Sequence, residues 1–372
     1  MPIVCWGGGN GKVTLIDINE TAVQSLRKGR VPFKEDGAEA ILAECLDKNL
    51  FITSDKNVVA QADVICFVTG TPIDEHLNPR IKEVVDTVRE YATYFTKKQL
   101  IVLRSTLYPG TTKLIENIIL NESKAFKLAF CPERIQQGKG ISEIFSLPQL
   151  VSGTTKKAEK EASELFSIIA DKTILLSTEE AELAKLLTNS WRYLEFAVAN
   201  QFYMMVTELG FDFQKIFTAM TEDYPRAQHF ASPGLAAGPC LFKDTMQLAA
   251  FHKNHFFLGH SAMLINEGMP AFLVEEMKNK LDSSLKGKKV AILGMTFKAN
   301  NDDIRESLSF KIKKLLEFQM AEVIMSDPYL PDSYELEEAL ELADGIILGV
   351  PHKEYFNLNI NKAYVDCWGI WA

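Results

Sequence analysis

The sequence predicts an α/β protein in which two parallel-sheet domains are joined by a central helical region. Through the first half, short apolar runs alternate with helix-like stretches, which is typical of a parallel sheet covered by helices. From about residue 178 to residue 280 the pattern changes to long helical periodicity. A second alternation of strands and helices starts near Lys286. These changes predict domains at 1–177, 178–280 and 281–372.

Composition limits the classes of partner. A chain of 372 residues exceeds one ordinary core, and 47% hydrophobic with 24% charged residues is typical of globular proteins. The net charge of -9 argues against nucleic acid as the main partner. We find no apolar run long enough for membrane insertion and no signal-peptide pattern. The six cysteines and six histidines lack metal-binding spacing. We therefore expect no metal and a cytoplasmic protein.

The first half contains six apolar runs that predict strands and four amphipathic stretches that predict helices. The predicted strands are Pro2–Trp6, Lys12–Ile16, Val64–Val68, Leu100–Leu103, Lys127–Phe130 and Gln149–Val151. The predicted helices are Glu20–Lys28, Ala38–Asp47, Arg80–Phe95 and Thr111–Ile118.

A glycine-rich turn between Gly7 and Gly11 follows the first predicted strand, and Asp17 closes the second. In a Rossmann-like domain, such a turn admits a dinucleotide pyrophosphate to a helix N-terminus. The acid at the end of the second strand then binds the adenosine ribose. The pattern predicts cofactor contacts at Gly7, Gly9, Gly11 and Asp17.

The spacing of these two strands conflicts with that fold. The second strand begins at Lys12, which leaves no residues for the helix that must connect two parallel strands. Either the sequence lacks a segment or the fold is broken at its cofactor site. Because every later element is intact, we favour a missing segment.

The central region predicts long helices, over Glu179–Leu209, Phe213–Thr221 and Asp244–Asn266. Lys185 and Asn189 are four residues apart and share one face of the first helix, where they form either a solvated stripe or part of a site. Apolar residues on both sides of this helix suggest a homodimer.

The C-terminal region repeats the strand-helix rhythm of the first half, with Asp327 in the place that Asp17 holds there. Its predicted strands are Val290–Leu293, Glu322–Met325, Gly345–Val350 and Ala363–Cys367. Its predicted helix is Leu308–Phe318.

The stretch from Gly234 to Asp244 combines small residues with chemistry-bearing ones. Glycines allow close approach of the backbone to a ligand, and Cys240 lies beside Lys243 and Asp244. A thiol becomes a nucleophile where a cation or a helix N-terminus favours its thiolate. The alternative is that Cys240 is a small buried apolar residue.

Several short motifs, in order, resemble the nucleotide-sugar 6-dehydrogenase family, which includes UDP-glucose, GDP-mannose and UDP-N-acetylmannosamine dehydrogenases. The strongest is Gly238-Pro-Cys-Leu-Phe-Lys-Asp244, which resembles the nucleophile segment of the family. The others are Gly70-Thr-Pro72, Ser105-Thr-Leu-Tyr-Pro-Gly110, Cys131-Pro-Glu-Arg134, Glu182-Leu-Ala-Lys-Leu-Leu-Thr-Asn189, Phe297-Lys298 and Asp302-Asp-Ile-Arg-Glu-Ser307. The resemblance covers nearly the whole chain except the first helix.

The resemblance implies oxidation of a C6 alcohol to a carboxylate with two NAD in succession. Cys240 would form a thiohemiacetal and then a thioester, while Lys185 and Asn189 would stabilise the oxyanion. Asp244 and Glu133 would handle protons or water, with support from Thr106. Glu133 could instead be a surface carboxylate and Thr106 a strand-end cap.

The resemblance also implies binding residues. Those for NAD are Gly7, Gly9, Gly11, Asp17, Thr71, Thr106, Lys243 and Arg305. Those for the UDP-sugar are Glu133, Arg134, Lys185, Asn189, Arg226, Gly238, Phe297 and Lys298, with Arg226 reaching across the dimer. The alternative for Lys298 and Arg305 is ordinary pairing with Asp302, Asp303 or Glu306.

The substrate is suggested by Arg134-Ile135, which follows Pro132-Glu133 where glucose and mannose members carry an aromatic residue and a leucine. This resembles the UDP-N-acetylhexosamine branch, UDP-N-acetylmannosamine in particular, and leaves UDP-glucose as the alternative. A non-catalytic nucleotide-sugar binder with a decayed cofactor site is a second hypothesis. A two-electron alcohol dehydrogenase is a third, and it leaves Cys240 unexplained.

Overall fold

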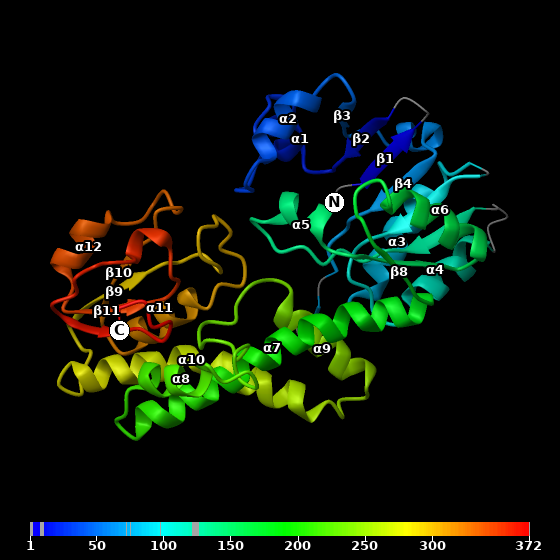
Figure 1. Cartoon of the computed structure of the whole chain (residues 1–372). Coiled ribbons are helices and arrows are strands. Elements are labelled where there is room, and N and C mark those ends of the chain that lie inside the picture. Colours follow the sequence, from blue (N-terminus) through cyan, green and yellow to red (C-terminus); the bar gives the residue numbers. More distant parts are fainter. Residues whose placement is uncertain are drawn as a thin grey trace. The chain divides into compact units, whose positions relative to one another are not determined.

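The structure is a computed structural model, and it describes residues 3–7, 11–71, 73–74, 76–96, 98–120 and 126–371. The chain divides into two compact units (Figure 1). Unit 1 comprises Met1–Thr188 and Ala250–Lys253, and unit 2 comprises Asn189–Ala249 and Asn254–Ala372. Each unit contains its own sheet, so the predicted α/β class with two sheet domains is confirmed.

Unit 1 is built on an eight-stranded sheet of order β3-β2-β1-β4-β5-β6-β7-β8. Its strands are β1 Ile3–Gly7, β2 Lys12–Ile16, β3 Leu50–Thr53, β4 Val64–Phe67, β5 Leu100–Leu103, β6 Lys127–Phe130, β7 Gln149–Gly153 and β8 Thr173–Leu175. Its α-helices are α1 Glu20–Arg27, α2 Ala38–Cys45, α3 Ile81–Ala92, α4 Thr111–Leu120, α5 Gly140–Ser146 and α6 Lys156–Phe166, and a short 3-10 helix spans Lys56–Gln61.

The alternation of side chains along β5 shows how the sheet is covered. Ile101 and Leu103 face a cluster that includes residues of α3 and α4. Leu100 and Val102 point the other way, into a cluster with Phe166 of α6. Because successive residues of a strand face opposite sides, a continuous apolar run is buried on both faces.

The first strand departs from the predicted topology. β1 pairs antiparallel with both β2 and β4, whereas β2–β3, β4–β5 and β5–β6 are parallel. Gly7 lies opposite Lys12, so the chain returns directly into β2 without a crossover helix. The four residues between Gly7 and Lys12 are too few for a parallel connection, which forces the hairpin.

Unit 2 contains a four-stranded parallel sheet of order β10-β9-β11-β12. The strands are β9 Lys289–Leu293, β10 Glu322–Ser326, β11 Gly345–Leu348 and β12 Ala363–Val365. The helices are α8 Phe213–Thr221, α9 Leu241–Phe251, α10 Phe257–Lys280, α11 Ser309–Phe318 and α12 Leu336–Leu342, with a 3-10 turn at Lys353–Tyr355. The 31-residue helix α7, Thr178–Glu208, begins in unit 1 and ends in unit 2.

One predicted helix is divided. The stretch Asp244–Asn266 is shared between α9 and α10, because Lys253 and Asn254 both adopt left-handed backbone angles and end the first helix. Within the described part of the chain, none of the helices combines the length and the hydropathy needed to cross a membrane.

Candidate active site

The loop that leads to Cys240 is fixed first at Gly234. The side-chain amide of Asn200 on α7 donates to the Gly234 carbonyl at 2.9 Å and accepts from its N–H at 2.8 Å. A Cβ at this position would lie 2.3 Å from the ring of Trp368. Glycine is therefore required, and the position of the loop is set by buried contacts.

The same loop is fixed again at Gly238. Its φ of +97° favours glycine, and a Cβ would lie 2.6 Å from the ring of Phe297. Its N–H donates to the carbonyl of Glu306 at 3.2 Å. The structure thus brings Gly238 and Phe297 together, two of the residues predicted to bind the sugar nucleotide.

Cys240 is exposed and immediately precedes α9. Its carbonyl accepts the N–H of Asp244 at 2.9 Å, which closes the first turn of that helix. The N-terminus of a helix favours negative charge on a nearby atom. By contrast, burial raises the pKa of Cys66 to about 11 and that of Cys131 to about 12. The interpretation of Cys240 as a small buried residue is therefore wrong.

Asp244 lies fully buried behind the cysteine. It accepts from the Asn189 amide at 2.6 Å, and Lys243 Nζ lies 3.4 Å from its other oxygen. Lys185, one turn before Asn189 on α7, is also buried. The solvated-stripe interpretation of this helix face is wrong, since both residues lie inside the protein.

Three predicted cationic residues lie in unit 2. Arg305 forms a bidentate pair with Asp303, with contacts of 2.6 to 3.0 Å. The hydrogen bonds to Asp303 raise the pKa of Arg305, and the charge of Cys240 adds to the shift. The predicted ordinary pairing of Arg305 with Asp303 is thus present, and Cys240 also acts electrostatically on the Arg305 guanidinium. Lys298 is partly buried, and Arg226 is exposed and stacks on Tyr224 at 5.9 Å.

In unit 1, Glu133 is tied to a residue that sequence analysis overlooked. Its carboxylate pairs with the buried Arg104 guanidinium and accepts the backbone N–H groups of Arg134 and Ile135. Arg104 also lies 4.6 Å from the ring of Phe166. Glu133 is thus a held, partly buried carboxylate, and the surface interpretation is wrong. The Arg134 side chain donates to the carbonyl of Pro148.

Thr106 lies in the loop between β5 and α4. Glu182 of α7, fully buried, accepts the N–H of Gly110 at 2.6 Å and both the N–H and hydroxyl of Thr112 at 2.8 and 2.6 Å. It thereby closes the N-terminus of α4. Burial raises the pKa of Glu182 against these hydrogen bonds. The Glu182 side chain therefore fixes the loop that carries Thr106. Glu182 is part of a motif quoted in the sequence, but the sequence did not predict this role.

The described residues fit an NAD site only in part. Asp17 follows the carboxyl end of β2, where it accepts the N–H of Asn19, and Gly70-Thr71 follow β4. Gly7 pairs with Lys12, four residues before Ile16 along β2, so it lies about 13 Å from the Asp17 end of the strand. Gly7 and Gly11 therefore lie at the opposite end of β2 from Asp17, which is not the predicted juxtaposition. Gly9 lies outside the described residues.

Sequence reasoning overlooked four positioning residues, which are Arg104, Glu182, Asn200 and the buried His352. Arg104 directly follows an apolar strand and Asn200 interrupts an apolar stretch of helix, whereas Glu182 and His352 lie among other charged residues. A polar residue in an apolar stretch indicates a buried partner without naming it, because the partner is distant in the sequence.

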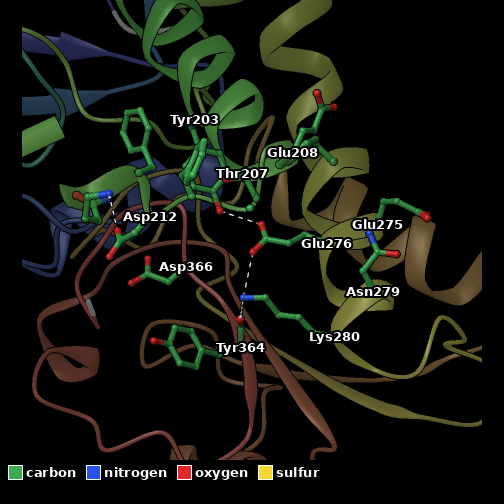
Figure 2. A pocket seen from close by; sticks show the side chains of 15 residues that line it. Tyr203, Thr207, Glu208, Asp212, Glu275, Glu276, Asn279, Lys280, Tyr364 and Asp366 are labelled. Carbon is green, nitrogen blue, oxygen red and sulfur yellow. Dashed lines mark hydrogen bonds and ion pairs between the residues drawn. The ribbon is translucent and has the colours of Figure 1, made fainter. Parts of the chain in front are cut away.

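A cavity of about 780 Å³ in unit 2 is unsuited to a diphosphate (Figure 2). Its lining includes Glu208, Asp212, Glu275, Glu276 and Asp366, with Lys280 as a cation already paired to Glu276 at 3.1 Å. Like charges repel, so an anionic ligand is excluded from it.

Three segments of the chain match one family. Residues 3–170 match the NAD-binding domain of the UDP-glucose/GDP-mannose dehydrogenase family, residues 179–267 its central domain and residues 291–371 its UDP-binding domain. Together these matches cover most of the chain.

Curated relatives and solved structures agree with these matches. A UDP-N-acetyl-D-mannosamine dehydrogenase of Pyrococcus horikoshii is 29% identical over 92% of this chain and 84% of its own length. A UDP-glucose 6-dehydrogenase of Bacillus subtilis is 29% identical over 89% and 79%. The structure of a UDP-glucose dehydrogenase from Pyrobaculum islandicum is similar with a TM-score of 0.88 at 26% identity, covering 95% of this chain and 88% of that one.

Proposed function

This chain belongs to the UDP-glucose/GDP-mannose dehydrogenase family, and on that basis we propose that it oxidises the C6 alcohol of UDP-N-acetylmannosamine, or a related UDP-N-acetylhexosamine, to the carboxylate. Relatives in Pyrococcus horikoshii and Methanococcus maripaludis named for this substrate support the proposal, together with Arg134-Ile135. UDP-glucose is the alternative, supported by the Bacillus subtilis relative.

The exposed Cys240 at the N-terminus of α9 is the observation that carries the mechanism. NAD, when bound, takes up one hydride in each of two oxidations. After the first, the Cys240 thiolate adds to the C6 aldehyde and gives a thiohemiacetal oxyanion. The buried Lys185 and Asn189 stabilise that oxyanion as donors. Loss of the second hydride leaves a thioester on Cys240, which keeps the reactive aldehyde from escaping.

Hydrolysis then needs a positioned water. Glu133 is held as a carboxylate by Arg104, so it orients and deprotonates the water with support from Thr106. The water oxygen attacks the thioester carbon, the Cys240 thiolate leaves, and the carboxylate product forms. Asp244, held by Asn189, takes up or returns the proton near the sulfur.

Phe297 and Lys298 bind the sugar nucleotide, and Gly238 packs against the Phe297 ring. Phe297 supplies an aromatic face, and Lys298 supplies a point charge for the diphosphate. Arg305 contacts the nicotinamide cofactor beside Cys240. Local cations of this kind explain how a chain of net charge -9 binds an anionic substrate.

The enzyme works as a homodimer in the cytoplasm. An exposed apolar stripe on α7, continued by Leu209 just after the helix, supports the dimer, with Trp191, Val198, Met205 and Leu209 at 62%, 44%, 52% and 69% exposure. In this proposal Arg226, which is exposed on unit 2, reaches the substrate site of the neighbouring subunit. The five cysteines that the structure describes are free thiols, as expected in a reducing compartment.

The displaced glycine turn favours a second candidate, a nucleotide-sugar binder without catalysis. One assay separates the two. Purified protein with UDP-N-acetylmannosamine, UDP-glucose, UDP-N-acetylglucosamine or GDP-mannose should yield two NADH per sugar with the first. Cys240→Ser should lose acid formation while keeping UDP-sugar binding. Tight sugar-nucleotide binding with no NADH from any donor would establish the binder instead.

A further inference from the structure

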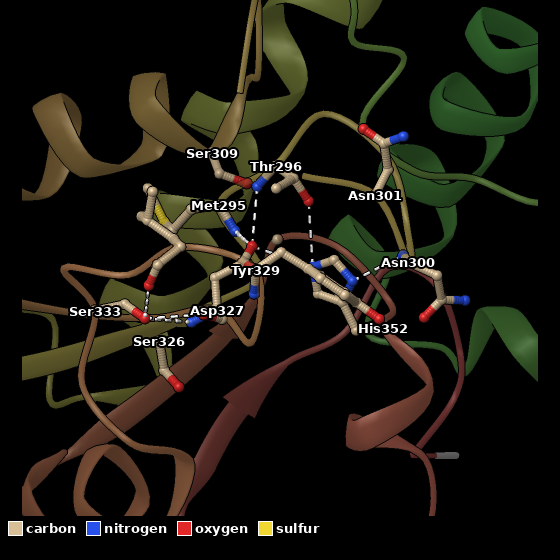
Figure 3. Close-up of polar contacts among 12 residues, drawn as sticks. Met295, Thr296, Asn300, Asn301, Ser309, Ser326, Asp327, Tyr329, Ser333 and His352 are labelled. Carbon is tan, nitrogen blue, oxygen red and sulfur yellow. Dashed lines mark hydrogen bonds and ion pairs between the residues drawn. The ribbon is translucent and has the colours of Figure 1, made fainter. Parts of the chain in front are cut away.

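We propose that His352 and Asp327 form a buried positioning pair that holds the segment 295–306 in the shape that binds the sugar nucleotide and supports the Cys240 loop. The inference rests on the proposed function, since Phe297, Lys298 and Arg305 all lie on this segment. Both members of the pair are buried, and they come from different strand ends (Figure 3).

Asp327 holds the start of the segment. One carboxylate oxygen accepts the N–H groups of Met295 at 2.6 Å and Thr296 at 3.0 Å, and the other accepts the N–H of Tyr329 at 2.8 Å. In a dinucleotide-binding sheet this position supplies the ribose acid. Here the oxygens of Asp327 already accept backbone N–H groups. Asp327 therefore follows a strand as Asp17 does, but it holds the backbone instead of a ribose.

His352 holds the middle of the segment. Its Nδ1 accepts the N–H of Asn300 at 2.9 Å, so the neutral ring carries its proton on Nε2, which lies 3.1 Å from the Asp327 carboxylate. The Asn300 side chain accepts the N–H of Lys353 at 3.0 Å. The ring is packed between Tyr329 and Tyr355, with centroids 5.0 and 5.4 Å away.

The segment needs such support because its backbone is strained. Asn300 and Glu306 have φ of +59° and +54°, a left-handed conformation that costs a non-glycine residue about 1 kcal/mol or more. The strained residues lie next to the Cys240 loop. The Glu306 carbonyl accepts the N–H of Gly238, and the Phe297 ring packs against Gly238. Contacts therefore run from His352 through the segment to the loop of Cys240.

Two substitutions separate the two halves of the pair. His352→Gln places an amide donor near Nε2 and keeps the bond to Asp327 while losing the acceptor for Asn300. His352→Asn places an acceptor near the position of Nδ1. It keeps the hydrogen bond from the Asn300 N–H and loses the hydrogen bond to Asp327. Tyr355→Phe is the matched control, because it removes a buried hydrogen bond to the Ser326 carbonyl, which lies outside the segment 295–306, and keeps the ring that packs on His352.

The readouts are UDP affinity by calorimetry, the separate effects on KM and kcat, and the alkylation rate of Cys240 resolved by peptide mass spectrometry. Both histidine variants should weaken UDP binding about tenfold and raise KM with little change in kcat. Both should also change the alkylation rate of Cys240. Tyr355→Phe should lower the melting temperature and leave all three readouts unchanged.

Asn300→Gly guards against loss of folding, because Asn300 is exposed and glycine accepts its backbone angles. It should weaken UDP binding about threefold through loss of the Lys353 contact. The positioning pair would be overturned if UDP affinity were unchanged in His352→Gln, His352→Asn and Asn300→Gly. It would also be overturned if UDP affinity changed in these variants by the same factor as in Tyr355→Phe. Failure of the unmodified protein to bind UDP would count against the proposed function instead.

Discussion

At the scale of single residues, the candidate site depends on buried polar groups that satisfy one another. Asp244 has no exposed surface and depends on the Asn189 amide and on Lys243. A buried carboxylate that loses such donors is costly, because no water replaces them. The fold therefore tolerates this buried acid, four residues after the proposed nucleophile Cys240, only while its partners are present.

Substitution of Asn189 tests this dependence. Asn189→Ala removes the donor and should destabilise the protein by about 1–3 kcal/mol, with kcat down about 10²-fold if the amide stabilises the oxyanion. Asn189→Asp places a second carboxylate against Asp244, so the loss of stability should exceed that of Asn189→Ala, because two like charges then meet in a buried place. Urea unfolding and initial rates measure both effects.

Thr188→Ala is the control, because its hydroxyl is exposed and donates to the Ala184 carbonyl on the same helix. An Asn189→Ala variant as stable and active as Thr188→Ala would remove Asn189 from the site.

Asp327 predicts a pH dependence of stability. Burial acts to raise the pKa of Asp327, but the hydrogen bonds from His352 and from backbone N–H groups outweigh it and leave the pKa lowered. A lowered folded-state pKa stabilises the protein above the ordinary value of 3.8 and loses that stability as pH falls through the lowered pKa. Asp327→Asn should therefore melt well below the parent at pH 6, with the difference shrinking below about pH 4. A constant difference across this range would contradict it.

At the scale of elements, the β1–β2 hairpin determines what kind of cofactor site unit 1 offers. A five-residue strand that runs antiparallel to its neighbours sends its following turn to the opposite edge of the sheet. The carboxyl edge keeps Asp17 and the loops after β4 and β5. Asp17, the predicted ribose acid, thus follows the carboxyl end of β2, whereas no helix N-terminus follows Gly11, since β2 begins at Lys12.

Paired substitutions test which part binds NAD. Asp17→Asn should weaken NAD binding about tenfold or more, because a charged acceptor is lost while its bond to Asn19 is kept. Gly11→Ala, which meets open space, should cost about 1 kcal/mol of backbone strain and leave NAD affinity unchanged. Calorimetric titration of NAD measures both. Equal weakening by Gly11→Ala would show that the turn belongs to the site.

At the scale of the whole molecule, α7 begins in unit 1, ends in unit 2 and also exposes an apolar stripe. Its buried face carries Asn189, Tyr193 and Asn200, whereas the apolar stripe of Trp191, Val198 and Met205, continued by Leu209 after the helix, is solvent-exposed. With 3.6 residues per turn these two sets lie on opposite sides of the helix. One helix therefore supplies residues for the site and for the proposed dimer.

Met205→Glu tests the dimer. A buried charge at an apolar interface should shift the protein to a monomer, or raise the dimer dissociation constant by about 10²-fold. Light scattering after size exclusion measures the mass. Phe318→Glu is the control, since this residue is 86% exposed on α11 and lies off the stripe. A dimer that survives Met205→Glu unchanged would place the interface elsewhere.

The sequence by itself determined the α/β class, most strands and helices to within two residues, and the candidate nucleophile. Hydrophobic periodicity and turn residues are local signals, so Lys127–Phe130 and Phe213–Thr221 are predicted with the bounds they have. The spacing of Gly7 and Lys12 already excluded a parallel connection between β1 and β2. Tertiary structure alone decided the pairing of Glu133 with Arg104 and the His352–Asp327 pair. Those features depend on which distant backbone and side-chain groups meet in the core, and no local pattern encodes that meeting.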